Sequence, residues 1–511
     1  MAFSPSVGAS GAEDVDEYRA REVRRGASRE RVSAASIVGT EERDGYKRKH
    51  SMLFGAFRSA LQPACIIRRA PRKLPSLVAR PLTTTSFTAH RSFTRLHAPR
   101  FQSHPFSTKN DASSNPPVLP PRSVGHWLMF SSTLVFAVIV VGGVTRLTES
   151  GLSITEWRPI TGILPPLSHD EWMQEFDKYR ATPEFKLLNH TISLHDFKSI
   201  FYMEWGHRIL GRIIGLAFVG PLVYFAVRKQ LSSALSRRLA GLALLIGAQG
   251  ALGWYMVKSG LDDSLMDTPG AVPRVSQYRL AAHLGTALVL YAGMFGTGLA
   301  VIKDWKFSRG VPWSGLKGSA DFQAILNNPI VRTFNRQAWA LTGLVFLTAL
   351  SGAFVAGLDA GLLYNEFPLM GGRLAPPSDE LFATAYAKNP DNSDLWWRNI
   401  FENPTTTQFD HRLLAMTTYA STALLFAKTL RPTVRAVLPP MARVATAAAF
   451  AMANVQVLLG ISTLLYLVPV PLAASHQAGS VALLSAMIHI LITLRRPSAA
   501  AQIWCKAMSK A

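Results

Sequence analysis

The sequence predicts an all-α membrane protein with eight transmembrane helices arranged as two pseudo-symmetric four-helix bundles. Hydrophobic residues make up 48% of the 511 residues and charged residues only 17%, whereas soluble domains carry about 25% charged residues. Eight long stretches are also apolar and almost free of charge. A membrane-crossing helix needs about 20 such residues. An internal sequence repeat, described below, predicts the two bundles.

The segment before the first span differs in composition from the rest of the chain. Residues 52–110 hold ten Lys or Arg and no acid, a pattern typical of a mitochondrial transit peptide. Residues 1–51 contain acids such as Glu13 and Asp16, which suit a presequence poorly, so one hypothesis is that translation starts at Met52. We therefore expect 1–122 to be a transit peptide and linker.

The expected spans divide the remaining chain into two halves. The span bounds are 126–146, 206–227, 239–257, 280–302, 337–357, 412–427, 444–469 and 477–494. We expect an N-terminal four-helix half at 123–303 and a basic loop at 304–336. A C-terminal four-helix half at 337–496 and a tail at 497–511 complete the chain.

The charges between the spans predict the orientation. Four segments together carry 18 Lys or Arg and two acids: 228–238, 303–336, 428–443 and 495–511. Three other segments together carry 11 Lys or Arg and 18 acids: 147–203, 258–279 and 358–408. Basic loops stay on the inner side of a membrane. We therefore expect a mitochondrial inner-membrane protein with both termini in the matrix. The net charge is +22. We expect its basic residues to set topology and to contact membrane lipid, and we do not expect nucleic-acid binding.

Three short motifs recur in the same order in both halves. The motif Glu204-Trp-Gly-His207-Arg208 resembles Gln408-Phe-Asp-His411-Arg412, Gln249 to Gly253 resembles Gln456 to Gly460, and His283-Leu-Gly resembles His476-Gln-Ala. Parallel internal repeats are common in membrane proteins. The repeat therefore predicts two four-helix halves in the same orientation.

Four histidines occupy matching positions in this repeat and predict metal binding. His207, His283, His411 and His476 each lie near the outer end of an expected span. Facing helices of a bundle can present two imidazoles to one haem iron, although imidazole also suits copper and zinc. Glycines such as Gly206, Gly211, Gly215, Gly285 and Gly293 would leave room for a macrocycle.

The repeat breaks where Glu204 in the first half corresponds to Gln408 in the second. A carboxylate in a pocket of low polarity can act as a base or stabilise developing positive charge. We therefore expect the first half to react and the second to store or pass electrons. Arg208, Arg212 and Arg412 lie within two turns of the histidines and are candidates either for haem propionates or for fixing loop carboxylates.

These motifs resemble those of the haem A synthases of mitochondria and alphaproteobacteria, over about 122–496. The resemblance rests on Gly142-Gly-Val-Thr-Arg146, Glu156-Trp157-Arg-Pro, Glu204-Trp-Gly-His207-Arg, Pro273-Arg-Val-Ser, Phe409-Asp-His411-Arg and His476-Gln-Ala-Gly. Some bacterial members carry a cysteine pair in the first outer loop. This chain has no cysteine in 147–203, so a mechanism through that pair does not apply.

The resemblance implies an oxidoreductase that converts the C8 methyl group of haem O into a formyl group, giving haem A for cytochrome c oxidase. It implies that His411 and His476 hold a resident haem b, that His207 and His283 hold haem O, and that Glu204 is the catalytic residue. It also implies ferredoxin and ferredoxin reductase as electron donors, and haem O synthase and cytochrome c oxidase assembly factors as further partners. A homo-oligomer is compatible with the sequence.

One alternative of another class remains open. A non-catalytic di-haem cytochrome b or haem carrier would use the same four histidines for electron transfer. The difference between Glu204 and Gln408 favours the enzyme, because a relay has no need of a carboxylate in one half only.

Overall fold

The computed structural model describes residues 117–158, 162–267, 272–316 and 322–509. The predicted transit peptide, the 1–51 segment and most of the linker lie outside these ranges. Within them, the regular structure is helical apart from one isolated β-bridge between Met370 and Arg373. The predicted all-α class is confirmed.

Eight of the described helices are long and apolar enough to cross a membrane, which confirms the predicted number of spans. They are α2 (Arg122–Leu147), α5 (Leu194–Val227), α6 (Ser233–Lys258), α7 (Gln277–Ser308), α9 (Pro329–Gly357), α12 (Pro404–Leu430), α14 (Pro440–Leu465) and α15 (Val470–Thr493). Several begin at residues that favour a helix start. Ser193 and Ser232 accept capping hydrogen bonds for α5 and α6, while proline opens α9 and α12.

Two spans begin well before the apolar stretch from which they were predicted. Helix α5 starts at Leu194 and α12 at Pro404, whereas the expected bounds began at 206 and 412. The extra turns of α5 include Asp196 and Lys198, which polar surroundings outside the membrane accommodate. Hydropathy detects only the membrane-embedded length of such a helix, because the turns beyond it are polar.

The helices of each half contact one another in the same order. In the first half α2 contacts α5, α5 contacts α6, α6 contacts α7, and α7 returns to α2; in the second half α9, α12, α14 and α15 repeat this pattern. The two halves meet where α7 contacts α9 and α15 and where α15 contacts α2. The matching contacts support two four-helix units, while their exact pseudo-symmetry remains a prediction.

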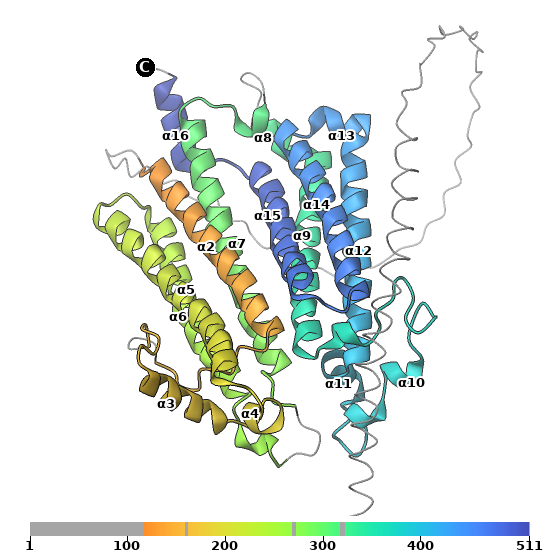
Figure 1. Ribbon diagram of the computed structural model, residues 1–511. Coiled ribbons are helices and arrows are strands. Elements are labelled where there is room, and N and C mark those ends of the chain that lie inside the picture. Colours follow the sequence, from red (N-terminus) through yellow and green to blue (C-terminus); the bar gives the residue numbers. More distant parts are fainter. Residues whose placement is uncertain (1–116, 159–161, 268–271, 317–321, 510–511) are drawn as a thin grey trace, which may run out of the picture. The chain divides into compact units, whose positions relative to one another are not determined.

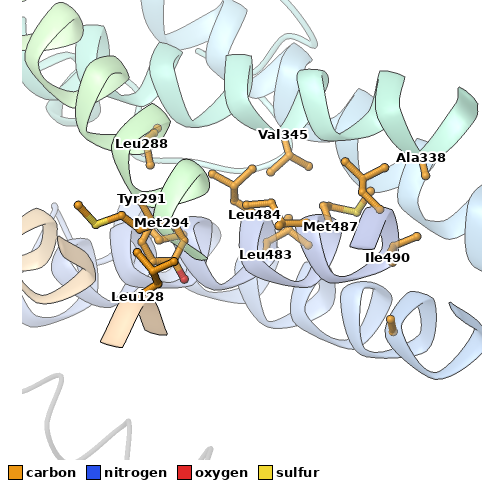
Figure 2. Close-up of a cluster of buried hydrophobic side chains, with 14 of the residues drawn as sticks. Leu128, Leu288, Tyr291, Met294, Ala338, Val345, Leu483, Leu484, Met487 and Ile490 are labelled. Carbon is orange, nitrogen blue, oxygen red and sulfur yellow. The ribbon is translucent and has the colours of Figure 1, made fainter. Parts of the chain in front are cut away.

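Many fully buried side chains lie along this seam between the halves. Figure 2 shows Leu128 of α2 and Met294 of α7 in the same cluster as Val345 of α9 and Met487 of α15. Of the eight spans, α7 and α15 are the most enclosed by protein. Lipid tails are as apolar as these side chains, so this cluster stabilises the contact between the halves through close van der Waals packing, and the outer faces are left for lipid.

Short helices gather at the two ends of the spans (Figure 1). One end carries α3 (His169–Arg180), α4 (Pro183–Leu187), α10 (Ser378–Leu381) and α11 (Leu395–Glu402); the other carries α8 (Phe322–Asn327), α13 (Pro432–Val437) and α16 (Ala499–Met508). Single 3₁₀ turns cover Asp263–Leu265, Trp313–Gly315, Ala360–Leu362 and Thr384–Tyr386.

The first outer loop packs onto the extended end of α5. Trp172, Phe176 and Tyr179 of α3 form a separate buried cluster with Phe197 and Phe201 of α5. The stacked or edge-on ring pairs in this cluster have centroids 5.0–5.9 Å apart, which is the favourable range for aromatic contacts. The cluster fixes the loop close to Glu204, one turn further along α5.

A pair of salt bridges joins the halves at the end of the spans that carries α3 and α11. Asp359 follows α9 in a left-handed conformation with φ 52°, and its carboxylate pairs with two arginines of the first half. Arg146 Nη2 lies 2.8 Å from one carboxylate oxygen and Arg274 Nη1 lies 3.1 Å from the other.

Candidate functional site

His411 and His476 face each other in the second half. His411 lies on α12 and His476 on α15, and their ring centroids are 6.5 Å apart with the ring planes at 86°. Two metal–imidazole bonds of about 2 Å on opposite sides of one metal place ring centroids roughly 6 Å apart. The rings therefore stand at the spacing of two axial ligands.

His207 and His283 form the corresponding pair in the first half. His207 lies on α5 and His283 on α7, and they are close enough to interact electrostatically. The structure thus brings together the four histidines that the sequence singled out, as two pairs, each pair within one half. Their roles as haem ligands stay a prediction.

A glycine on a neighbouring helix faces each of the four rings. A Cβ atom built on these glycines would approach a ring atom to 3.2, 3.4, 3.4 and 2.8 Å respectively. The pairs, in the same order, are Gly142 with His207, Gly253 with His283, Gly352 with His411, and Gly460 with His476. Larger residues would crowd the rings, so each glycine keeps an imidazole free to take its position.

Sequence reasoning missed the function of these glycines, although half of the signal was present. Gly253 and Gly460 close the repeated glutamine motif, four residues after Gln249 and Gln456. The expected glycines behave differently. Gly206, Gly211 and Gly215 have nothing within 4 Å of a built Cβ, whereas Gly285 and Gly293 face Leu350 and Leu242.

The repeated glutamines hold the backbone beneath two of the histidines. Gln249 Nε2 donates to the carbonyl of His283 at 3.2 Å, and Gln456 Nε2 donates to that of His476 at 2.8 Å. Each carbonyl therefore accepts a hydrogen bond from a side chain of the neighbouring helix. This bond fixes the position of the histidine relative to that helix.

The ring nitrogens of the histidines differ in their hydrogen-bond partners. Ser351 Oγ lies 2.7 Å from His411 Nδ1, which leaves Nε2 of that ring for a metal. Among the described residues, the Nδ1 atoms of His283 and His476 are buried without a hydrogen-bond partner. Buried polar atoms are normally paired, so these orphaned nitrogens fit a site that is completed by a bound group.

Glu204 sits beside the first pair and is fully engaged by donors. The residue is 3% exposed. One carboxylate oxygen accepts from Ser153 Oγ at 2.7 Å and the backbone N–H of Ile154 at 2.8 Å, and the other accepts from Arg208 at 2.6 and 3.0 Å. These four contacts occupy both carboxylate oxygens, so the position of the side chain is fixed.

Gln408 has the equivalent place in the second half but makes a simpler contact. Its side-chain nitrogen donates to the carbonyl of Tyr364 at 3.2 Å. Its Oε1 is buried and has no partner among the described residues. The charge difference that the sequence predicted between the halves is therefore matched by a difference in hydrogen bonding.

The three candidate arginines all bind backbone carbonyls of the outer loops. Arg208 donates to Ile154 and Glu156, Arg212 donates to Arg158, and Arg412 donates to Tyr364 and Leu369, at 2.7–3.0 Å. Each arginine thus ties a loop to a helix that carries one of the paired histidines. Nε of Arg412 is buried and has no partner among the described residues, so a donor remains for a propionate.

A second buried carboxylate lies close to Glu204. Glu184 of α4 is 3% exposed, and its Oε2 has no partner among the described residues. Burial, followed by the nearby charges of Glu149 and Glu204, raises the pKa of Glu184 to about 8, against a smaller opposing effect of Arg146. Sequence reasoning did not single out Glu184, because a lone acid in a polar loop gives no signal of burial.

Helix α2 touches both sites through consecutive glycines. Gly142 faces His207, and a Cβ on Gly143 would lie 1.6 Å from Oε1 of Gln477, the residue after His476. Gln477 Nε2 in turn donates to the carbonyl of Ile139 at 3.0 Å. The side chain that follows a second-half histidine therefore packs directly on the helix that lines the first-half site.

Comparison with known proteins places this arrangement in a family. Residues 125–488 match the COX15-CtaA family model, described as a cytochrome oxidase assembly protein. The chain is 46% identical over 404 residues to the haem A synthase COX15 of Saccharomyces cerevisiae, covering 79% of this chain and 81% of that protein. It is 45% identical to the haem A synthase of Nitrosospira multiformis, covering 73% and 94%. A haem A synthase–mitochondrial ferredoxin fusion protein of Schizosaccharomyces pombe is 43% identical, covering 82% and 68%.

Proposed function

Because the chain belongs to the COX15-CtaA family of cytochrome oxidase assembly proteins, we propose that it oxidises the methyl group of haem O to the formyl group of haem A. Haem A synthesis itself is the function of its relatives at 41–46% identity, and the chain is a multi-pass mitochondrial membrane protein of this kind. The observation that carries the proposal is the histidine pair in each half, with a glycine facing every ring.

The second half holds a resident haem b between His411 and His476. Support comes from the 6.5 Å ring separation, the hydrogen bond from Ser351 to His411, and the glycine against each ring. Arg412 would orient the group through its remaining buried donor. The bound haem supplies an iron that takes up and releases single electrons, and the protein supplies the two imidazoles that hold it.

The first half takes haem O between His207 and His283. The open space beside Gly211 and Gly215, which lie on the same face of α5 as Glu204 and Arg208, is where a bulky macrocycle with its farnesyl tail would lie. The loop after α2 closes this face, because Glu204 and Arg208 together bind Ser153, Ile154 and Glu156. The loop would exclude water from the reacting methyl group.

Glu204 would act as a fixed charge beside the substrate. Four donor contacts occupy its oxygens, so stabilisation of developing positive charge suits it better than general-base catalysis. Gln408 cannot do this in the second half. The asymmetry assigns the chemistry to the first half and the storage of electrons to the second.

Electrons would come from a ferredoxin and its reductase. The fission-yeast relative is a single chain named as a fusion of haem A synthase with mitochondrial ferredoxin, which supports a ferredoxin as partner. Lys306 and Arg309 lie on the basic side, where an acidic electron carrier would dock. The matrix is the compartment that we propose for this side, in the inner membrane.

Pigment extraction tests the proposal. Membranes that contain the chain and a supply of haem O should yield haem A, whereas His207→Ala and Glu204→Gln should yield at least tenfold less. His126→Ala is the matched control, because His126 lies at the opposite end of α2, and it should keep full yield. If wild type returned haem O unchanged while retaining haem b, the chain would be a di-haem relay or carrier.

A further inference from the structure

A pocket of about 480 Å³ opens on the basic side, remote from both histidine pairs. It lies between the end of α8, the first turns of α9 and the residues that follow α15. Three arginines line it: Arg332, Arg495 and Arg496. None of its eight lining residues is acidic. We propose that this pocket binds the phosphate headgroup of an anionic phospholipid.

The positive charge of the pocket is only partly neutralised. Arg495 Nη2 pairs with Asp304 at 2.6 Å, so that one guanidinium is compensated. Arg496 Nη2 donates to the neutral amide oxygen of Asn327 at 2.8 Å, which positions the group but leaves its charge. Arg332 is exposed, and no acidic partner is found for it in the described ranges. Two positive charges that have no acidic partner among the described residues therefore face one cavity.

Two buried polar atoms add unused hydrogen-bonding capacity. Nε of Arg495 and Oδ1 of Asn335 are buried and have no hydrogen-bond partner among the described residues. Asn335 lies one turn after Arg332 on α9. A buried donor without a hydrogen bond costs about 1–3 kcal/mol. A phosphate oxygen would accept a hydrogen bond from Nε of Arg495. The amide oxygen of Asn335 needs a donor instead, such as a headgroup hydroxyl.

The position of the pocket selects a lipid over a soluble anion. Its arginines stand where α9 enters and α15 leaves the spanning region, the depth at which phospholipid phosphates lie. Leu326, Val331 and Leu494 also line it but are buried, so the accessible lining is mainly polar and suits a headgroup. Basic pockets between spans on the inner side bind such headgroups. Two free guanidinium charges suit a headgroup with two phosphates.

Native mass spectrometry of the purified, delipidated chain tests this assignment. Diphosphatidylglycerol should bind at one equivalent and more tightly than phosphatidylglycerol, while phosphatidylcholine should bind weakly. Arg332→Gln and Arg496→Gln should each weaken diphosphatidylglycerol binding about fivefold, since a basic residue near a membrane surface contributes about 1 kcal/mol towards an anionic lipid. Arg336→Gln, on the next turn of α9 and outside the pocket, should leave binding unchanged.

Three outcomes would overturn the proposal. Equal loss with Arg336→Gln would show general surface attraction. Equal affinity for inorganic phosphate alone would identify a soluble-anion site. Unchanged binding in the Arg332→Gln/Arg496→Gln double variant, with its thermal unfolding unaltered, would place the lipid elsewhere. Because the readout is lipid binding, failure here leaves the proposed haem chemistry untouched.

Discussion

At the scale of single residues, the four glycines that face the histidines carry the most information about function. A glycine in a transmembrane helix usually permits close helix packing. Here each one is turned towards an imidazole ring instead of a helix backbone. The sequence located the histidines, because their spacing is visible in the repeat, but it could not reveal which glycine faces which ring. That depends on helix rotation.

Gly460→Val should weaken haem binding in the second half. A built Cβ already lies 2.8 Å from His476 Cε1, so a branched side chain would displace the ring that we propose as a haem ligand. We expect several-fold less resident haem per chain, measured by pyridine haemochromogen absorbance. Gly343→Val on α9 is the control, because nothing lies within 4 Å of a Cβ there. Equal haem content in Gly460→Val and Gly343→Val would contradict a role of Gly460 in positioning the His476 ring.

Glu184 should make stability depend on pH. Its pKa is raised from 4.5 to about 8 in the folded chain. An unfolded glutamate ionises near its ordinary pKa, so the folded state binds the extra proton between pH 4.5 and 8. Stability is therefore full below the unfolded pKa and falls as pH rises through this window, at up to about 1.4 kcal/mol per unit.

The substitution Glu184→Gln should remove that dependence. We expect the midpoint of thermal unfolding in detergent to fall between pH 5 and 8 in the wild type, and to fall less in Glu184→Gln. Glu171→Gln, in the exposed first turn of α3, controls for a generic loss of charge. A wild-type midpoint that rises over this range, with Glu184→Gln following the same curve, would show that Glu184 is ionised in the fold.

At the scale of elements, hydropathy predicted all eight spans but not the helices at their ends. Helix α3 is amphipathic and polar on average, so nothing in an apolar window marks it. Its burial comes from Trp172, Phe176 and Tyr179 packing on α5. The early start of α5 follows from the Ser193 cap and Asp196, a local signal that span prediction by apolar length ignores.

The contact between α2 and α15 should be measurable as a coupling energy. Gly143→Ala would displace the Gln477 side chain, since the built Cβ lies 1.6 Å from its Oε1. The displaced end is flexible, so the expected cost is about one hydrogen bond, roughly 1 kcal/mol. Gln477→Ala alone loses the bond to Ile139. The double variant should cost no more than Gln477→Ala; strict additivity in chemical unfolding would refute the contact.

At the scale of the whole molecule, the repeat predicted two four-helix halves, and the same order of helix contacts recurs in each. The seam between the halves was not predictable. It depends on Met487, Val345 and Leu128 meeting across distant segments, and on Asp359 reaching Arg146 and Arg274. Apolar residues on several faces of a span do not reveal which face meets protein and which meets lipid.

The charge distribution predicts the orientation of the whole chain, which cysteine labelling can test. Cys505 lies on α16, at the basic end, and is partly exposed. A membrane-impermeant maleimide applied to mitochondria without outer membranes should leave Cys505 unlabelled until the inner membrane is opened. In Cys505→Ser/Lys388→Cys, the new thiol in the exposed second outer loop should react at once. Early labelling of Cys505 would invert the proposed topology.

The division of tasks between the histidine pairs is the central claim, and haem content in the absence of haem O tests it most directly. We would purify the wild type, His283→Ala and His476→Ala and measure haem b per chain together with the low-spin signal in electron paramagnetic resonance. The wild type and His283→Ala should retain the resident haem and its bis-imidazole signal, whereas His476→Ala should lose both. Loss in His283→Ala with retention in His476→Ala would reverse the assignment of the halves, and equal loss in both would contradict separate sites.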